Sequence, residues 1–354
     1  MLSARPSPRS NVASMLAWQL HETNGPESYR LEEVPDPIPG LGQVLIRLRT
    51  AALNHLDLWV SRGLPAPHSF PHVAGGDGAG IIEALGPGVA TVSVGDEVVI
   101  DPSLSCGECP SCLSGNSTAC RRFGILGEHA WGTLAEMVVV PAANALLKPE
   151  QLTWEEVGSY GLVTGTAFRM VRRSRLSKGD LLLVVGVGGG VAAATFSLGL
   201  ALGAEVHVTS TDPAKREWAL ANGAIGAYDS GGGFSSELAD AAGRKADVVV
   251  DSIGEATWNQ SMRSLAPEGR LAICGATSGS KVELPLTVLF YKQLEIIGST
   301  MFDHTDFAEV TEMVGSRRVI VPIDKVFPFD DLPDALIRLD EGNQMGKVVL
   351  RIPR

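Results

Sequence analysis

The sequence predicts an α/β protein in which a β-rich part is followed by a doubly wound parallel sheet. The central observation is the apolar run of residues 181–185, which indicates a strand buried on both faces. A glycine-rich turn, an apolar helix over 191–202 and a second strand over 206–209 follow it directly. From about residue 153 helical and strand patterns alternate, which is typical of a parallel sheet covered by helices.

The N-terminal part, residues 15–140, is predicted to be mostly β because short apolar runs alternate with turn residues. The predicted strands in this part are 44–48, 80–83, 98–100 and 137–140. Further along the chain, strands are predicted over 247–251, 270–274 and 294–298, and helices over 213–221, 256–265 and 307–314. Three glycines at 231–233 predict a loop. The C-terminal part predicts a helix over 334–339 and a strand over 347–352.

Length and charge limit the class of protein. The chain has 354 residues, which is enough for two domains. Its formal net charge of −11 argues against nucleic acid or an acidic membrane surface as the main partner. No apolar run reaches the length of a membrane span, so no membrane partner is expected. Residues 1–14 lack the apolar stretch of a secretory signal and predict a disordered tail, with a transit peptide as the alternative.

Four of the five cysteines lie close together in the sequence, at Cys106, Cys109, Cys112 and Cys120. Four thiolates at this spacing can close a tetrahedron around one Zn²⁺ and leave no open position, so a structural zinc site is predicted. An iron–sulfur site and two disulfides are the alternatives. The pattern favours a cytoplasmic location, where thiols stay reduced. Cys274 ends a predicted strand and is expected to pack in the core.

The glycine-rich turn is the predicted site for a dinucleotide diphosphate. Glycines permit a tight turn and a close approach of the ligand, and the following helix N-terminus attracts an anion. The residues expected to hold the diphosphate are Gly186, Gly188, Gly189, Gly190 and Val191. Val191 stands where the strict G-x-G-x-x-G motif has its third glycine, and a glycine-rich surface loop is the alternative.

The residues after the second strand favour NADP(H) over NAD(H). Ser210 and Thr211 offer hydroxyls, and Lys215 and Arg216 offer positive charge, which suits a 2′-phosphate. Asp212 supports the alternative, because an acidic residue near this place binds the ribose 2′-hydroxyl of NAD.

Several stretches resemble the medium-chain dehydrogenase/reductase superfamily. They are Leu-Asn-His-Leu-Asp at 53–57, Gly-Gly-Asp-Gly-Ala-Gly at 75–80, Thr-Gly-Thr-Ala-Phe at 164–168, Gly-Ser-Thr-Met at 298–301 and Gly-Lys-Val-Val-Leu at 346–350. The resemblance implies a GroES-like β domain over 15–155 with 305–354, and a Rossmann domain over 156–304. It also implies a zinc lobe over 103–123, an active-site cleft between the domains, and a homodimer formed across the edges of the Rossmann sheets.

The resemblance also implies that the catalytic metal of many family members is missing. In those members three side chains hold a second zinc, and the corresponding positions here are Asn54, Gly76 and Leu162. Glycine and leucine offer no side-chain ligand. The alternative is an improvised metal site built from the nearby polar side chains, which are His55, Asp57, His72 and Asp77.

This departure is similar to the zinc-free quinone oxidoreductase branch, although that branch commonly lacks the cysteine lobe. It implies NADPH-dependent transfer of a hydride to a small-molecule acceptor, either a quinone or an activated enone or carbonyl. Such acceptors are already electrophilic, so no metal is needed to polarise them. The alternatives are a zinc-dependent alcohol dehydrogenase with replacement ligands and a non-catalytic NADPH-binding protein.

Individual cofactor-binding residues follow from the resemblance. It implies that Thr166 packs against the nicotinamide and that Lys347 reaches the diphosphate. Gly275 and Ser299 complete the expected cofactor-binding set.

Catalytic residues are expected near the motif at 53–57. Asn54 is expected to donate a hydrogen bond to the acceptor carbonyl as negative charge develops there. His55 is expected to donate a proton near neutral pH. Asp57 is expected to orient Asn54, His55 or Lys347 rather than to act on the substrate.

Overall fold

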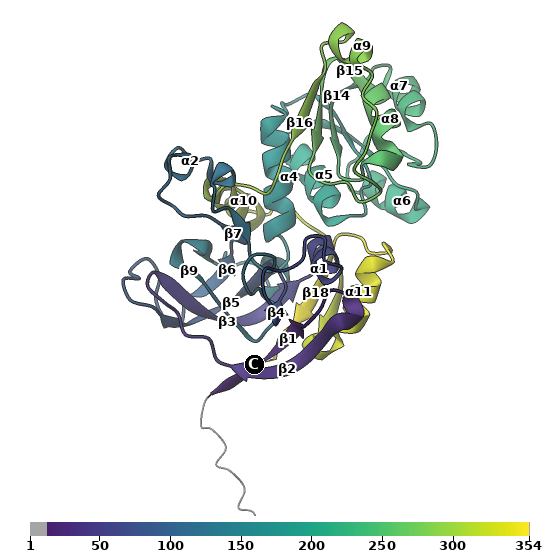
Figure 1. Cartoon of the computed structure of the whole chain (residues 1–354). Coiled ribbons are helices and arrows are strands. Elements are labelled where there is room, and N and C mark those ends of the chain that lie inside the picture. Colours follow the sequence, from purple (N-terminus) through teal and green to yellow (C-terminus); the bar gives the residue numbers. More distant parts are fainter. Residues whose placement is uncertain (1–12, 354) are drawn as a thin grey trace, which may run out of the picture.

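The structure is a computed structural model that describes residues 13–353. The chain forms a β-rich unit and an α/β unit, which lie one below the other in Figure 1. The purple, blue and yellow segments of the β-rich unit come from both ends of the sequence. The teal and green segments of the α/β unit come from the middle, so the predicted α/β class with two unlike parts is confirmed.

The β-rich unit is built on two main sheets, in which all neighbouring strands are antiparallel except the parallel pair β17 and β18. The smaller sheet has the order β2-β1-β4, with β1 (Ser14–Leu20), β2 (Tyr29–Pro35) and β4 (His72–Val73). The larger sheet has the order β10-β6-β5-β3-β18-β17, and β9 also pairs with β3. Its strands are β3 (Gln43–Ala52), β5 (Asp77–Leu85), β6 (Glu97–Ile100), β9 (Met137–Pro141), β10 (Ala145–Leu147), β17 (Ile323–Pro328) and β18 (Lys347–Arg351).

Strand β18 brings the C-terminal end of the chain back to the N-terminal sheet. It pairs antiparallel with β3, with Val349 opposite Ala52. The backbone N–H of Leu53 donates to the carbonyl of Val348 at 2.9 Å. Lys347, the first residue of β18, therefore lies beside the turn that follows β3.

The α/β unit contains a six-stranded sheet in which every neighbouring pair is parallel. Its order is β13 (Gly226–Tyr228), β12 (Glu205–Thr209), β11 (Leu181–Val184), β14 (Ala246–Asp251), β15 (Leu265–Ile273) and β16 (Glu295–Gly298). Leu182 and Val184 pack into the core on one face of β11, and Leu181 and Leu183 pack on the other. All four are fully buried, which confirms the prediction of a strand buried on both faces.

Helices cover both faces of this sheet. The core on one face includes side chains of α4 (Gly161–Arg173), α5 (Gly190–Ala201) and α6 (Pro213–Ala221). The core on the other includes side chains of α7 (Phe234–Ala242) and α8 (Glu255–Ser264). A short helix, α9 (Leu286–Tyr291), precedes the edge strand β16.

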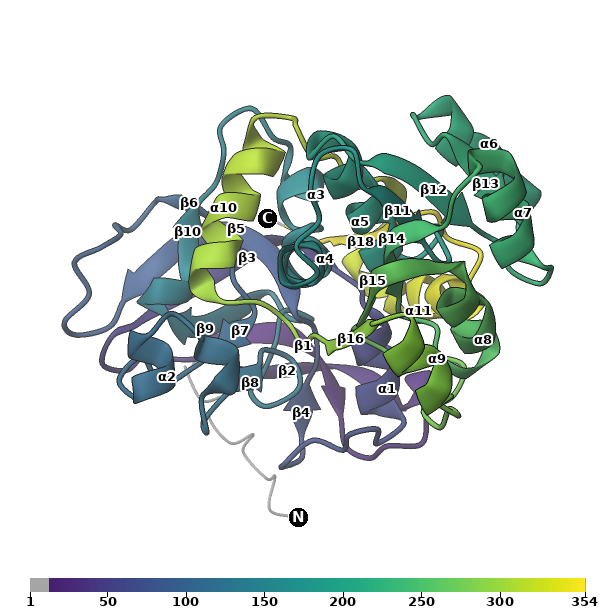
Figure 2. The same ribbon diagram turned by 90° about the horizontal axis from the view of Figure 1, so that it is seen from above.

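Helix α4 connects the two units. It packs against α5 and against α10 (His304–Gly315), and Figure 2 shows it between these two helices. An apolar cluster at this junction contains Tyr160, Val163, Phe302 and Phe307. The remaining short elements are β7 (Ser103–Leu104), β8 (Gly124–Ile125), α1 (His55–Ser61), α2 (Pro110–Leu113), α3 (Trp154–Val157) and α11 (Leu332–Asp340).

Sequence patterns missed β1, β2, β13, β17, α4, α7 and α9, as well as the short elements β4, β7, β8, β10, α1, α2 and α3. Helix α7 follows three glycines and presents a narrow apolar face, because few of its side chains reach the core. Strand β17 has only weak alternation and ends at Pro328. Ser14, the last residue of the predicted tail, begins β1, and residues 1–12 of that tail lie outside the described residues. Across residues 13–353, no helix combines the length and apolar character that crossing a membrane requires.

Candidate active site

A cavity of about 570 Å³ lies where the β-rich unit meets the α/β unit. One wall comes from α1 and the turn after β8, and the opposite wall comes from the glycine turn before α5 and the ends of the parallel strands. Its lining includes Asn54, His55, Trp59, Ile125, Glu128, Leu162, Thr166, Gly186, Gly190, Gly275, Met301 and Lys347. The cavity therefore collects most of the residues that the sequence singled out.

A buried ion pair lies at the wall of this cavity. The Lys347 ammonium donates to Asp77 Oδ2 at 2.8 Å and to Asn54 Oδ1 at 2.6 Å. Asn54 Nδ2 in turn donates to Asp77 Oδ2 at 3.0 Å. Lys347 is 2% exposed and Asp77 is 1% exposed, so the two charges neutralise each other away from water.

This ion pair engages the groups that would otherwise surround a catalytic metal. Asp77 Oδ1 accepts from the backbone N–H of Leu162 at 2.6 Å, and Oδ2 is shared by Lys347 and Asn54. The side chain of Leu162 packs against Gly76, where an added Cβ would lie 3.1 Å from Leu162 Cδ1. The side chains that meet here include the ammonium of Lys347, which is positively charged and has no lone pair to offer a metal. These residues therefore do not fit a second zinc ion.

His72, another candidate ligand, is engaged elsewhere. The Nε2 atom of His72 is 3.0 Å from the carbonyl oxygen of Gly127, and His72 is buried in the β-rich unit. Among residues 13–353, the only group of His, Cys, Asp and Glu side chains close enough to hold a metal ion is the four-cysteine cluster. An improvised metal site at the cavity is therefore not supported.

Asp57 has a positioning role. Its Oδ2 accepts from the backbone N–H of Asn54 at 2.8 Å, and its Oδ1 accepts from the backbone N–H of Gly75 at 3.0 Å. Burial raises the pKa of Asp57 to about 6, and these hydrogen bonds oppose that rise. Asp57 does not line the cavity. Through its hydrogen bond to Gly75 it ties α1 to the segment before β5.

Asn54 and Thr166 both line the cavity with their polar groups partly engaged. Asn54 Nδ2 contacts Asp77 at 3.0 Å and the carbonyl of Ala52 at 3.4 Å. The Thr166 hydroxyl donates to the carbonyl of Leu162 at 2.7 Å, one turn earlier in α4. The hydroxyl oxygen of Thr166 remains available as an acceptor.

His55 lines the cavity beside Trp59, with 6.2 Å between the ring centroids. Burial and the charge of Lys347 lower the pKa of His55. The neutral imidazole is therefore favoured near pH 7, which makes His55 a poor proton donor.

The glycine turn has the geometry that a diphosphate requires. Gly186 has a φ of 79°, a conformation that residues with a Cβ rarely adopt. Helix α5 begins at Gly190, where an added Cβ would lie 2.8 Å from Val163 Cγ1. Gly186, Gly189, Gly190 and Val191 line the cavity at this helix N-terminus. Gly188 is the exception, because it faces Lys215 outside the lining.

The end of β12 presents hydroxyls and an arginine. Ser210 is buried, and its carbonyl accepts from Arg216 at 2.6 Å. Thr211 is exposed. The Asp212 carboxylate caps α6 by accepting from the backbone N–H of Ala214 at 2.8 Å, so its place is explained by the helix.

The three remaining predicted cofactor residues are Gly275, Ser299 and Lys347, and the structure places them differently relative to the cavity. Gly275 lines the cavity after β15. Ser299 is buried outside the lining, and its hydroxyl has no hydrogen-bond partner among the described residues. Its neighbours Thr300 and Met301 line the cavity instead. Lys347 lies beside Gly190, but its ammonium is directed to Asn54 and Asp77.

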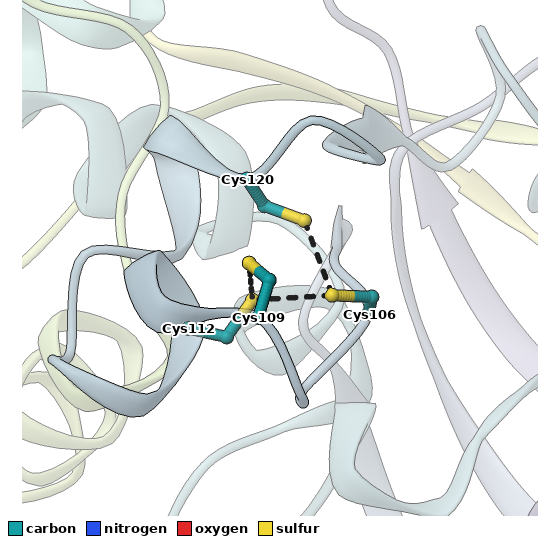
Figure 3. Close-up of side chains that lie close together, drawn as sticks. All are labelled: Cys106, Cys109, Cys112 and Cys120. Carbon is teal, nitrogen blue, oxygen red and sulfur yellow. Dashed lines mark hydrogen bonds between the residues drawn. The ribbon is translucent and has the colours of Figure 1, made fainter.

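The four cysteines converge in a separate lobe, shown in Figure 3. Their ligand atoms all lie within 4.8 Å of one another. Cys106 Sγ and Cys112 Sγ are 3.8 Å apart, and Cys109 Sγ and Cys112 Sγ are 3.5 Å apart. Zn–S bonds of about 2.3 Å in a tetrahedron require sulfur separations of about 3.8 Å. The cluster fits one structural zinc ion, and all four cysteines are free thiols.

The lobe is attached to the segment that precedes α10. Asp303 Oδ1 accepts from the Ser117 hydroxyl at 2.8 Å and from the backbone N–H of Thr118 at 3.0 Å. The other carboxylate oxygen of Asp303 pairs with Arg169 of α4. The lobe is thus anchored to α4 and α10, away from the cavity.

The sequence pattern neither links Lys347 with Asp77 nor marks Glu128 as a site residue. No local signal connects Lys347 with Asp77, because they are 270 residues apart. Glu128 stands in a Gly-Glu-His turn after the cysteine lobe. A charged residue in such a turn is unremarkable until the turn is seen to face a cavity.

Two family models match the chain, and their order follows the two units. The model of the alcohol dehydrogenase GroES-like domain matches residues 40–150. The model of the zinc-binding dehydrogenase matches residues 190–316. A zinc-type alcohol dehydrogenase-like protein of Schizosaccharomyces pombe is 31% identical over 340 residues, which cover 92% of this chain and 94% of that protein. The chain belongs to the medium-chain dehydrogenase/reductase superfamily.

Other members of the superfamily are similar over nearly the whole chain. An acryloyl-coenzyme A reductase of Sulfurisphaera tokodaii is 28% identical over 329 residues, covering 92% of this chain and 97% of that protein. The crystal structure of an NAD-dependent alcohol dehydrogenase superposes with a TM-score of 0.92 at 38% identity, covering 96% of this chain and 100% of that one. Membership in an oxidoreductase superfamily and the combination of a GroES-like unit with a Rossmann-type unit are confirmed.

Proposed function

We propose that the protein is an NADPH-dependent oxidoreductase that transfers a hydride to a quinone or an activated enone or carbonyl without a catalytic metal. The observation that carries this proposal is the buried contact of Lys347 with Asp77 and Asn54 at the cavity wall. It fixes an ammonium group beside Asn54, one of the three positions at which the resemblance implies zinc ligands in many superfamily members.

The ammonium of Lys347 can assist the reduction. It has three N–H donors, and the structure engages two of them with Asn54 and Asp77. We propose that the third meets an acceptor oxygen at the cavity wall. A cation fixed in a site that excludes water stabilises the negative charge that develops on that oxygen. Asn54 then acts by orienting Lys347, and Asp57 by fixing the backbone of Asn54.

The remaining site residues suit a dinucleotide. The bound nicotinamide cofactor supplies the hydride. Gly186, Gly189 and Gly190 would hold the diphosphate at the N-terminus of α5, and Thr166 would border the nicotinamide. Ser210 and Arg216 at the end of β12 offer partners for a 2′-phosphate, which favours NADPH over NADH.

The acceptor class follows from the three positions where the resemblance implies zinc ligands, because Gly76 and Leu162 offer no ligand atom and Asn54 is hydrogen-bonded to Lys347 and Asp77. Quinones and α,β-unsaturated carbonyls accept a hydride without a Lewis acid, whereas a simple alcohol is a poor substrate without one. The similar acryloyl-coenzyme A reductase is named for an α,β-unsaturated thioester, which belongs to this chemical class. The cavity of about 570 Å³ has room for the nicotinamide and a small acceptor.

Zinc content and acceptor range together test this function. Zinc per chain would be measured by elemental analysis after mild dialysis against a chelator, and NADPH and NADH oxidation would be followed with quinones, enones and an enoyl thioester. One zinc ion with turnover of these acceptors supports the proposal. Two zinc ions with turnover of simple alcohols would support an alcohol dehydrogenase instead. NADPH binding without turnover of any acceptor would support a non-catalytic protein.

We further propose the domain boundaries 15–155 with 305–354 and 156–304, and a homodimer. The edge strand β16 of the parallel sheet pairs on one side only within the described chain. Beside it α9 exposes large apolar side chains, with Leu286 65%, Phe290 69% and Tyr291 85% exposed. A second copy covering this edge would remove them from water.

A further inference from the structure

Glu128 is an acidic side chain at the cavity with no assigned task. It lies in the turn between β8 and β9 and lines the cavity together with Ile125. Its side chain is 15% exposed. Among residues 13–353, no side-chain or backbone donor forms a hydrogen bond with its carboxyl group. Its ionic neighbour is His129, whose Nδ1 lies 3.6 Å from Glu128 Oε1, so no strong hydrogen bond within residues 13–353 holds the carboxyl group in place.

The turn that carries Glu128 is firmly held. Gly127 N–H donates to the carbonyl of Ala130 at 2.9 Å, and the Gly127 carbonyl lies 3.0 Å from His72 Nε2. Trp131 Nε1 donates to the carbonyl of Pro71 at 3.1 Å. Gly127 has a φ of 82° and packs so closely on Gly75 that an added Cβ would lie 2.5 Å from its carbonyl oxygen. The Glu128 backbone is therefore fixed against the wall of the cavity.

The neighbouring histidines do not neutralise Glu128 as full ion pairs. His129 Nδ1 accepts a hydrogen bond from the backbone N–H of Ile125 at 3.1 Å, so this nitrogen carries no proton. Its distance of 3.6 Å from Glu128 Oε1 is therefore not a charge-assisted hydrogen bond. Burial raises the pKa of Glu128, and the neighbouring imidazoles of His129 and His68 oppose this rise.

Other polar groups at the cavity are less suited to donate a proton. The Thr166 hydroxyl already donates to the carbonyl of Leu162. The neutral form of His55 is favoured by burial and by Lys347. Loss of a proton from Lys347 would leave the buried carboxylate of Asp77 without its counter-charge.

We propose that Glu128 is the general acid that protonates the acceptor after hydride transfer. The inference rests on the proposed function, which supplies the hydride. The hydride forms a C–H bond at the β-carbon of an enone, and the π electron pair moves to the carbonyl oxygen as an enolate. The Glu128 O–H bond then breaks, its proton forms a C–H bond at the α-carbon, and the carboxylate recovers a proton from water. For a quinone the proton goes to an oxygen.

The test compares Glu128→Gln with the wild-type protein and with Glu150→Gln, a control at an exposed glutamate outside the cavity. The measurements are kcat/KM for an enone across pH and the Kd for NADPH. Glu128→Gln is expected to lower kcat/KM by about 100-fold or more, in the range that a general acid contributes. The wild-type activity should fall as pH rises through the pKa of Glu128, and this fall should be missing in Glu128→Gln.

Two further variants keep the result decisive. Glu128→Asp should retain the pH-dependent fall with reduced activity, and Glu128→Ala should regain activity when formate is added, which a purely structural role would not produce. Unchanged NADPH binding in the variants would show that the cofactor site is intact. Two outcomes would overturn the role of Glu128 alone, provided that the wild-type protein turns over the acceptor. One is a kcat/KM of Glu128→Gln within about threefold of the wild-type value, and the other is a Glu128→Ala variant that formate does not rescue. A wild-type protein that reduces no acceptor would overturn the proposed function and this role together.

Discussion

Lys347 and Asp77 show how strongly one buried charge depends on its partner. Each is almost completely buried, and each makes its closest ionic contact with the other at 2.8 Å. Removing one partner leaves the other charge in a site of low dielectric constant. The pair therefore matters for the stability of the fold as well as for the chemistry of the cavity.

We expect Lys347→Met to lower the free energy of unfolding by about 3–5 kcal/mol, because it strands the Asp77 carboxylate. The double variant Lys347→Met/Asp77→Asn should recover part of this loss, since no buried charge then remains. Urea denaturation followed by circular dichroism measures both. Lys178→Met removes an exposed lysine and should change the free energy by less than about 0.5 kcal/mol. If Lys347→Met and Lys178→Met lowered the free energy of unfolding by similar amounts, the special cost of breaking the buried pair would be contradicted.

Ser210 gives a second test at the scale of one residue. A carboxylate there would face a 2′-phosphate with like charge, so Ser210→Asp should lower the ratio of kcat/KM for NADPH to that for NADH at least about tenfold. Arg216→Gln should lower the same ratio, because its guanidinium lies against the Ser210 carbonyl. Steady-state kinetics with both cofactors measure the change. An unaltered ratio in Ser210→Asp would place the 2′-phosphate elsewhere.

At the scale of elements, the cysteine lobe has little apolar material of its own. Its helix α2 is four residues long and buries no side chain. A closed metal site can supply the folding free energy that such a short segment lacks. The contacts of Asp303 with Ser117 and Thr118 then dock the folded lobe on α4 and α10.

We expect Cys112→Ser to reduce the zinc content from about one ion per chain to near none, because a closed tetrahedron needs all four thiolates. The midpoint of thermal unfolding should also fall. Cys274→Ser makes the same chemical change outside the cluster and should leave the zinc content unaltered. Elemental analysis and calorimetry give both quantities. Full zinc occupancy in Cys112→Ser would mean that the ion is held by other ligands.

At the scale of the whole molecule, the proposed homodimer forms through the edge of the parallel sheet. Strand β16 lies at one end of the sheet order, next to the exposed apolar surface of α9. In Figure 1, α9 is at the top of the molecule, at the end of the α/β unit away from the β-rich unit. An association through this edge leaves the cavity between the units open to substrate.

We expect the double variant Phe290→Asp/Tyr291→Asp to convert the dimer to a monomer, because the charges would be buried in the interface. Light scattering after size-exclusion chromatography measures the molar mass directly. Ile38→Asp changes another exposed apolar side chain, in the β-rich unit, and should leave the mass unaltered. A dimer that survives the double variant would require a different interface.

The sequence alone was sufficient for features that depend on neighbouring residues. The apolar run at 181–185 predicts a doubly buried strand, the glycine turn predicts a helix N-terminus, and the spacing from Cys106 to Cys120 predicts a closed cluster. In each case the structure has this arrangement. These patterns work because strand burial, helix capping and loop ligation are decided within about a dozen residues.

The centre of the cavity was decided by tertiary structure. Lys347 meets Asn54 across 293 residues only because β18 pairs with β3 in one register. Glu128 faces the cavity only because its turn is held by His72 and Gly75. Such contacts depend on sheet register and on packing between distant segments, which no local pattern encodes. The sequence therefore predicted a cofactor site and a zinc lobe, and the fold decided which charged side chains come together at the cavity.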